Sequence, residues 1–138
     1  MYDRLLLAVD DSDAAERVIN AAREMAVLSD GEVWALHVRE NEVFGRGGLF
    51  ATETAAQALS VVEHAAQELD DAGVKANYEV RNAIYGRTAH EIVDAARAHD
   101  ADVIVMGSTG RSDLTSLMHG NTAHKVIHLS DRLVLVVR

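Results

Sequence analysis

Glycines and hydroxyl-bearing side chains gather in the last third of the chain, directly after an apolar run. Val103–Met106 leads straight into Gly107-Ser108-Thr109-Gly110, and after nine intervening residues comes Gly120-Asn121-Thr122. Glycine lets the backbone approach a ligand closely, and the first turn of a helix presents unpaired N–H groups to an anion. This segment is therefore a candidate phosphate site. The alternative is that Gly107 and Gly110 only turn the chain and that Gly120 caps a short helix.

A carboxylate follows a second apolar run near the start of the chain, where Leu5–Val9 ends at Asp10. In a doubly wound sheet, ligands bind beyond the carboxyl ends of the strands, at the point where the strand order reverses. If the two runs form neighbouring strands there, Asp10 faces the glycine segment and can accept hydrogen bonds from ribose hydroxyls or an adenine amine. The alternative for Asp10 is a solvated turn or helix-capping residue.

No residue is assigned a catalytic role. Ser108, Thr109 and Ser112 are hydroxyls in a phosphate loop, and none has a dedicated base that the sequence identifies. The loop has no lysine, and Arg111 is its one fixed cation, so bound phosphates would be met by backbone N–H groups and by Mg²⁺ or Mn²⁺. Such a loop favours holding a nucleotide over transferring its phosphoryl group, which needs several positioned cations.

Histidines near the same end suggest a metal site only weakly. His124 and His128 are spaced one helical turn apart, with His119 nearby. No Glu-x-x-His pattern accompanies them and no third ligand is evident, so a solvated helix face is expected and no metal ligand is assigned.

Five apolar strand-like runs alternate with helical patterns around these residues. Asp13 and Glu16 indicate a helix start, Thr52 opens a second helix that buries Ala55 and Leu59, and Thr88-Ala89-His90-Glu91 resembles a capping box. The predicted strands are Leu5–Val9, Val33–Val38, Val74–Arg81, Asp102–Met106 and Leu133–Val137; Arg39–Ala51 is predicted to be a loop, and further helices span about Asp113–Met118 and Asn121–Ser130. Strict alternation predicts a parallel sheet between layers of helices.

Composition bounds the remaining possibilities. The 138 residues predict one domain, 1–138, and no apolar run is long enough for a membrane span. Met1–Leu5 leads directly into a strand, which leaves no room for a signal peptide, and cysteine is absent, so a cytoplasmic protein is expected. The net charge of −9 argues against nucleic-acid binding. Acids outnumber bases 22 to 13, with Lys75 and Lys125 as the only lysines, which indicates either a halophilic source or genomic G+C bias.

Several segments together resemble the universal stress protein family over essentially the whole length. Ala8-Val9-Asp10-Asp11-Ser12 is similar to the end of the family's first strand, Leu36-His37-Val38 to its second, and Ala101–Ser108 followed by Gly110-Arg111-Ser112 to its most recognisable segment. The ATP-binding branch carries G-x2-G-x9-G-[S/T]. The chain matches the three glycines at that spacing and has Asn121 at the Ser/Thr position.

The resemblance implies a single-domain, doubly wound, five-stranded parallel sheet of order 3-2-1-4-5, a Rossmann-like α/β sandwich that binds ATP with Mg²⁺ or Mn²⁺ across strands one and four. Asp10 would contact the ribose, the Val38 backbone would meet adenine, and Met106 and Gly107 would border the nucleoside. Gly110 and the site residues after it would surround the phosphates. The implied nucleotide-binding residues are Ala8, Val9, Asp10, Val38, Met106, Gly107, Ser108, Gly110, Arg111, Gly120, Asn121 and Thr122. An asparagine amide can still donate to phosphate, and Thr122 supplies a hydroxyl one position later.

The resemblance also implies a homodimer through Leu133–Val137, an apolar edge strand that invites pairing with a second copy. The favoured function is a cytoplasmic, regulatory adenine-nucleotide sensor in the stress response with an unknown protein partner. Two alternatives stay open: a slow ATPase or phosphoryl-transferring enzyme, and a nucleotide-independent, chaperone-like interaction protein.

Overall fold

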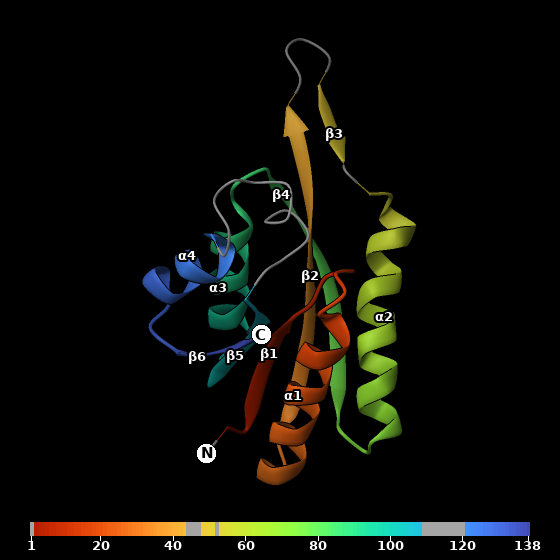
Figure 1. Ribbon diagram of the computed structural model, residues 1–138, viewed down its shortest axis with the longest axis vertical. Coiled ribbons are helices and arrows are strands. Elements are labelled where there is room, and N and C mark those ends of the chain that lie inside the picture. The colour runs from red at the N-terminus through yellow and green to blue at the C-terminus, as the bar shows by residue number, and fades with distance from the viewer. Residues whose placement is uncertain (1, 44–47, 52, 109–120) are drawn as a thin grey trace.

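A computed structural model describes residues 2–43, 48–51, 53–108 and 121–138. Strands and helices alternate along these residues, and Figure 1 shows two helical layers separated by one sheet. The elements are β1 (Arg4–Ala8), α1 (Ala15–Ser29), β2 (Glu32–Val43), β3 (Leu49–Ala51), α2 (Ala55–Asp71), β4 (Ala76–Ile84), α3 (Thr88–Ala98), β5 (Val103–Gly107), α4 (Asn121–Leu129) and β6 (Leu133–Val137).

The five long strands form a parallel sheet in the order β4-β2-β1-β5-β6. Counted along the chain without the short β3, this is the predicted order 3-2-1-4-5, and the predicted fold class is confirmed. β1 lies at the centre between β2 and β5, and its Leu5, Leu6 and Leu7 are completely buried. A continuous apolar run is what a strand covered on both faces requires.

One helical layer covers each face of the sheet. α1 and α2 bury Val18, Ile19, Val62 and other apolar residues against one face. α3 and α4 cover the other face, where Ile92, Val93 and Ala96 of α3 turn inward as predicted. Each helix buries only the face that it turns toward the sheet, so its apolar residues recur with the helical period. The central strands are covered on both faces, so their apolar runs are unbroken.

The prediction that Arg39–Ala51 forms a loop is wrong. β2 continues to Val43 and stays paired with β4 as far as Asn41–Ile84, and β3 pairs antiparallel with the end of β2. Figure 1 shows this hairpin reaching beyond the rest of the sheet. The extension is polar, with the sequence Arg-Glu-Asn-Glu over residues 39–42, so it lacks the apolar pattern that marks a buried strand.

Three predicted helix starts also need correction. α1 begins at Ala15 after Ala14, so Asp13 does not cap it, and α3 has no side-chain cap, because the Thr88 hydroxyl donates to the Glu40 carboxylate instead. The capping box occurs at α2, where Thr54 accepts from the Gln57 backbone N–H at 3.0 Å and the Gln57 side chain accepts from the Thr54 N–H at 2.8 Å. This cap places the start of α2 at Ala55, past Thr52.

The helix buries Val62, Ala66 and Leu69 as predicted, but Ala55 and Leu59 in its first two turns are exposed, contrary to prediction, and Ala58 and Ala65 are buried as well. The Asn121 helix was predicted to within one residue of its observed end at Leu129. The helix predicted at about Asp113–Met118 lies outside the described residues.

Candidate functional site

The parallel register brings the ends of β1 and β5 together beside a residue within β2, which continues beyond them. Ala8, the last residue of β1, pairs with Leu36 of β2 on one side and with Met106 of β5 on the other. Val38 lies two residues beyond Leu36 and Ser108 two residues beyond Met106, just as Asp10 lies two residues beyond Ala8. Segments widely separated in sequence thus meet at one level, between the two helical layers, where β1 and β5 end and β2 passes by.

Apolar side chains form the floor at this edge on both faces of the sheet: Val9 packs in the core covered by α1 and α2, and Val38 and Met106 pack in the core covered by α3 and α4. Val9, Val38 and Met106 are all buried, and Val9 continues the β1–β2 pairing by donating its N–H to the Leu36 carbonyl at 2.9 Å. Ser108 continues the β5–β6 pairing in the same way, its N–H donating to the Val137 carbonyl at 2.8 Å. Extended pairing holds the floor rigidly in place.

The Asp10 carboxylate lies at the rim of this floor, half-buried. Its Oδ1 accepts the Ser12 backbone N–H at 2.9 Å, an Asx turn that leads the chain toward α1. The turn role raised as the alternative is therefore observed. It fixes the direction of the carboxylate, whose two oxygens together offer about four acceptor positions.

The phosphate-loop residues are divided by what the structure describes. Gly107 ends β5 and Ser108 follows it, both half-buried, and Asn121 and Thr122 open α4. Gly110, Arg111 and Gly120 lie outside the described residues. The first turn of α4 supplies backbone N–H groups of the kind that bind anions.

Sequence reasoning missed a buried polar pair beside this edge, formed by His37 of β2 and Glu53. Both side chains are more than nine-tenths buried. The His37 Nδ1 bonds the Val9 carbonyl at 2.9 Å and its Nε2 bonds the Glu53 carboxylate. A carbonyl only accepts, so Nδ1 carries a proton. The Arg39 guanidinium donates to the Glu53 carbonyl at 3.0 Å, so residue 53 is fixed twice.

The signal that could have revealed this pair is an imidazole inside an otherwise apolar run, Ala35-Leu36-His37-Val38. A buried polar side chain must find a partner, and the partner lay sixteen residues away, beyond the region predicted to be a loop. The pair connects the residue before Asp10 to the segment that leads into α2. It is thus positioned to orient the rim of the site.

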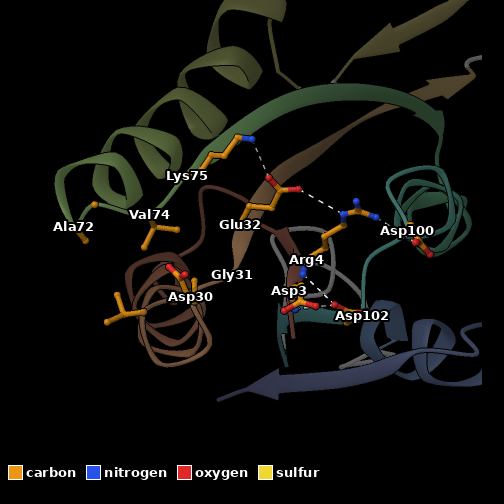
Figure 2. Close-up of a pocket in the computed structure, with 13 residues that line it drawn as sticks. Asp3, Arg4, Asp30, Gly31, Glu32, Ala72, Val74, Lys75, Asp100 and Asp102 are labelled. Atoms are coloured by element: carbon orange, nitrogen blue, oxygen red, sulfur yellow. Dashed lines mark hydrogen bonds and ion pairs between the residues drawn. The ribbon is translucent and has the colours of Figure 1, made fainter. Parts of the chain in front are cut away.

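The opposite, amino edge of the sheet carries an open depression of about 790 Å³. Figure 2 shows its charged side chains facing one another: Arg4 lies between Glu32 and Asp100, and Lys75 reaches Glu32. The Asp102 carboxylate accepts the backbone N–H groups of Asp3 and Arg4 at 2.8 and 3.0 Å. Carboxylates outnumber cations in this depression, since Asp3, Asp30, Glu32, Asp100 and Asp102 line it together with Arg4 and Lys75, and none of the predicted site residues lines it.

No helix in the described ranges has both the length and the apolar character needed to cross a membrane. Comparison with known proteins identifies the kind of protein to which this fold and strand-edge arrangement belong. The family model of the universal stress protein family matches residues 1–138. Universal stress protein YxiE of Bacillus subtilis is 31% identical, with all of both chains covered.

Two solved structures are similar in fold and sequence. The structure of MJ0577, a universal stress protein of Methanocaldococcus jannaschii, superposes with a TM-score of 0.79 at 27% identity, covering 99% of this chain and 96% of that one. The universal stress protein of Archaeoglobus fulgidus in complex with dAMP gives a TM-score of 0.74 at 27% identity, covering 99% and 98%. The matched range, the strand order and the sequence identities agree, and the chain belongs to the universal stress protein family.

Proposed function

We propose that this protein, as one universal stress protein domain over residues 1–138, binds an adenine nucleotide at the carboxyl edge of its sheet and acts as a regulatory protein of the stress response. The observation that carries this proposal is the register that ends β1 and β5 level with each other, beside Leu36 of the longer strand β2. A similar protein, the Archaeoglobus fulgidus relative, is described in complex with dAMP. A cytoplasmic location goes with this role as part of the proposal.

The donor set at this edge fits a nucleotide in kind. Val38 and Met106 would border a nucleoside on one face of the sheet, with Val9 beside them on the other face, and the half-buried Asp10 carboxylate can accept hydrogen bonds from ribose hydroxyls. The adenine edge would meet the Val38 backbone, with Ala8 and Gly107 bordering the nucleoside. Small side chains at those two positions leave room for a ring system.

The phosphates would extend from Ser108 toward the first turn of α4, where Asn121 and Thr122 lie. Gly110, Arg111 and Gly120 complete this part of the proposal, together with Mg²⁺ or Mn²⁺ held through the phosphates. The chain would bind the phosphates mainly through N–H groups, so a bound divalent ion would neutralise much of the phosphate charge.

Titration calorimetry of the protein with ATP, ADP and cyclic AMP tests the proposal, with and without Mg²⁺ and in molar KCl to screen the acidic surface. Asp10→Asn keeps an acceptor for the Ser12 N–H but loses the charge, so it should weaken binding by about 1.5–3 kcal/mol without unfolding the protein. Asp100→Asn is the matched control, because it removes an exposed carboxylate at the amino edge and should change nothing. Equal affinity of Asp10→Asn and wild type would place the nucleotide elsewhere.

We further propose that β6 pairs with β6 of a second copy to form a homodimer. Among the described strands β6 pairs only with β5, Leu133 is 53% exposed, and Ile127 of α4 adds an exposed apolar side chain nearby in sequence. An edge strand with apolar side chains is a template for pairing.

Light scattering coupled to size-exclusion chromatography measures this association. Leu133→Glu should shift the wild-type dimer to a folded monomer, because the residue is half-exposed in one copy. Leu28→Glu is the control, since Leu28 is 89% exposed on α1, away from β6, and should leave the dimer intact. A monomeric wild type would contradict the proposal.

A further inference from the structure

Three side chains that can ligate a metal meet on the outer surface of the helical layer formed by α1 and α2, which lie side by side in Figure 1. They are Glu16 from the first turn of α1 and His64 and Glu68 from α2. One ligand atom from each lies within 4.8 Å of the others. None of them belongs to the nucleotide site proposed above.

Helix geometry explains how two of the three are aligned. His64 and Glu68 are four residues apart on α2, so their side chains lie on one face, one turn apart. The His64 Nε2 lies 3.3 Å from a Glu68 carboxylate oxygen and 2.6 Å from a Glu16 carboxylate oxygen on the neighbouring helix. Two carboxylates therefore converge on one nitrogen atom.

Hydrogen bonding leaves this cluster incompletely satisfied. A ring nitrogen donates only one proton, so it cannot serve both carboxylates fully. The second oxygen of Glu68, Oε2, is buried and has no hydrogen-bond partner among the described residues. Burial, followed by the Glu16 carboxylate, raises the pKa of Glu68, whereas the hydrogen bond from His64 is the main cause that lowers the pKa of Glu16. The two carboxyl groups thus share one imidazole nitrogen, and one oxygen of Glu68 has no hydrogen-bond partner in the described part of the chain.

We propose that Glu16, His64 and Glu68 form a site for a divalent transition-metal ion of the Zn²⁺ type that links α1 to α2. Two carboxylate oxygens and one imidazole nitrogen make a ligand set that Zn²⁺ accepts, with water filling a fourth position. The imidazole favours Zn²⁺ over Mg²⁺, because Mg²⁺ prefers oxygen ligands and dehydrates reluctantly.

The distances require a small adjustment for the ion to enter. Ligands at about 2.1 Å in a tetrahedral site are roughly 3.4 Å apart, close to the His64–Glu68 separation and wider than the His64–Glu16 separation. The Glu16 side chain is 57% exposed, so it can swing outward without disturbing the core. The metal would replace the proton between these two side chains.

One cation competes with the metal. Arg23, two helical turns along α1 from Glu16, lowers the pKa of both Glu16 and Glu68 through its charge. Its positive charge repels a divalent ion. Removing this charge should therefore strengthen metal binding, whereas removing a ligand should weaken it.

Calorimetric titration of chelator-treated protein with Zn²⁺ alone, without nucleotide and at constant pH, tests the proposal. Micromolar or tighter binding with a rise in Tm is expected, and His64→Gln or Glu68→Gln should weaken it at least about tenfold. Arg23→Gln should strengthen it. Mg²⁺ at the same concentration should produce no comparable rise in Tm.

His124 and His128 are the matched control, because their rings lie 4.4 Å apart on α4 and could capture Zn²⁺ by themselves. The His124→Gln/His128→Gln double variant should retain the tight site and the Tm rise. Zn²⁺ binding that survives His64→Gln but disappears in this double variant would overturn the proposal, as would absence of Zn²⁺ binding to wild type.

Discussion

The two edges of the sheet both carry pairs of polar side chains with acidic and basic groups, but the pairs differ in burial. At the carboxyl edge the side chains of His37 and Glu53 are only 7% and 5% exposed. At the amino edge the Lys75–Glu32 pair joins side chains that are 77% and 37% exposed. Water screens the second pair and not the first, so similar chemistry should have very different energetic weight. The burial of a side-chain pair, and not the number of such pairs, therefore indicates where polar side chains stabilise this fold.

The largest effect on stability is expected for His37→Phe, at the buried pair. This substitution removes the partner of a buried carboxylate and the hydrogen bond to the Val9 carbonyl, so it should lower the free energy of unfolding by about 3–5 kcal/mol in urea denaturation. Adding Glu53→Leu should recover part of the loss, because no charge then remains buried there. A loss below about 1 kcal/mol for His37→Phe would show that the pair does not carry this weight.

Gly31→Ala tests whether close backbone packing, rather than ion pairs, stabilises the amino edge. A Cβ at this position would lie 2.5 Å from the Tyr2 carbonyl oxygen and 3.0 Å from a methyl group of Leu5. Backbone must shift to admit it, at a cost of about 1–3 kcal/mol in the same urea experiment. Glu32→Ala is the control at the next residue: it removes two exposed ion pairs, adds no atom and should cost less. The reverse ranking would contradict the comparison.

Glu79 of β4 provides an intermediate degree of burial, with its side chain 27% exposed and hydrogen-bonded to His99 and Arg81 at 3.0 and 3.1 Å. Burial acts to raise the pKa of Glu79, but the hydrogen bond from His99 and the charge of Arg81 outweigh it and hold the pKa below its ordinary value of 4.5. A lowered folded-state pKa contributes stability above the unfolded pKa and loses it as pH falls through the folded pKa.

Glu79→Gln should therefore cost about 1 kcal/mol at neutral pH. The difference between wild type and variant should shrink as the pH falls below 4.5. Urea denaturation at a series of pH values measures this difference. A difference that stays constant down to acid pH would mean that the carboxylate charge is not responsible.

Lys75→Gln should have the smallest effect, at most about 0.5 kcal/mol, because both partners of this pair are exposed. That effect should vanish in molar KCl, where charges at the surface are screened. Thermal unfolding at low and high salt checks it. A loss comparable to that of His37→Phe would remove the distinction between the two edges.

Most of the fold followed from local patterns in the sequence. The apolar runs that end at Val9 and Met106 correctly predicted buried parallel strands, and the expected strand order is confirmed. The polar end of β2 did not follow, because its pairing with β4 and β3 satisfies backbone groups and needs no apolar side chains. Capping was predicted at Thr88 and found at Thr54, since Glu40, distant in sequence, takes the Thr88 hydroxyl.

The candidate site could be predicted in part for the same reason. Asp10 and Ser108 lie at strand ends, which an apolar run marks directly. The His37–Glu53 pair depends on a tertiary contact across the hairpin, and the Glu16–His64 contact depends on how two helices pack. Contacts of this kind leave no periodic signal in the sequence.

The central position of β1 also bears on how the chain folds during synthesis. Leu5 of β1 pairs with Val103 of β5, so one edge of β1 stays unpaired until the fourth long strand has been synthesised. Contacts between such distant segments slow folding, and an uncovered strand of three leucines is prone to associate with other unfinished chains. Translation rate and chaperone supply should therefore affect the yield of this protein more than small changes in the stability of the finished fold.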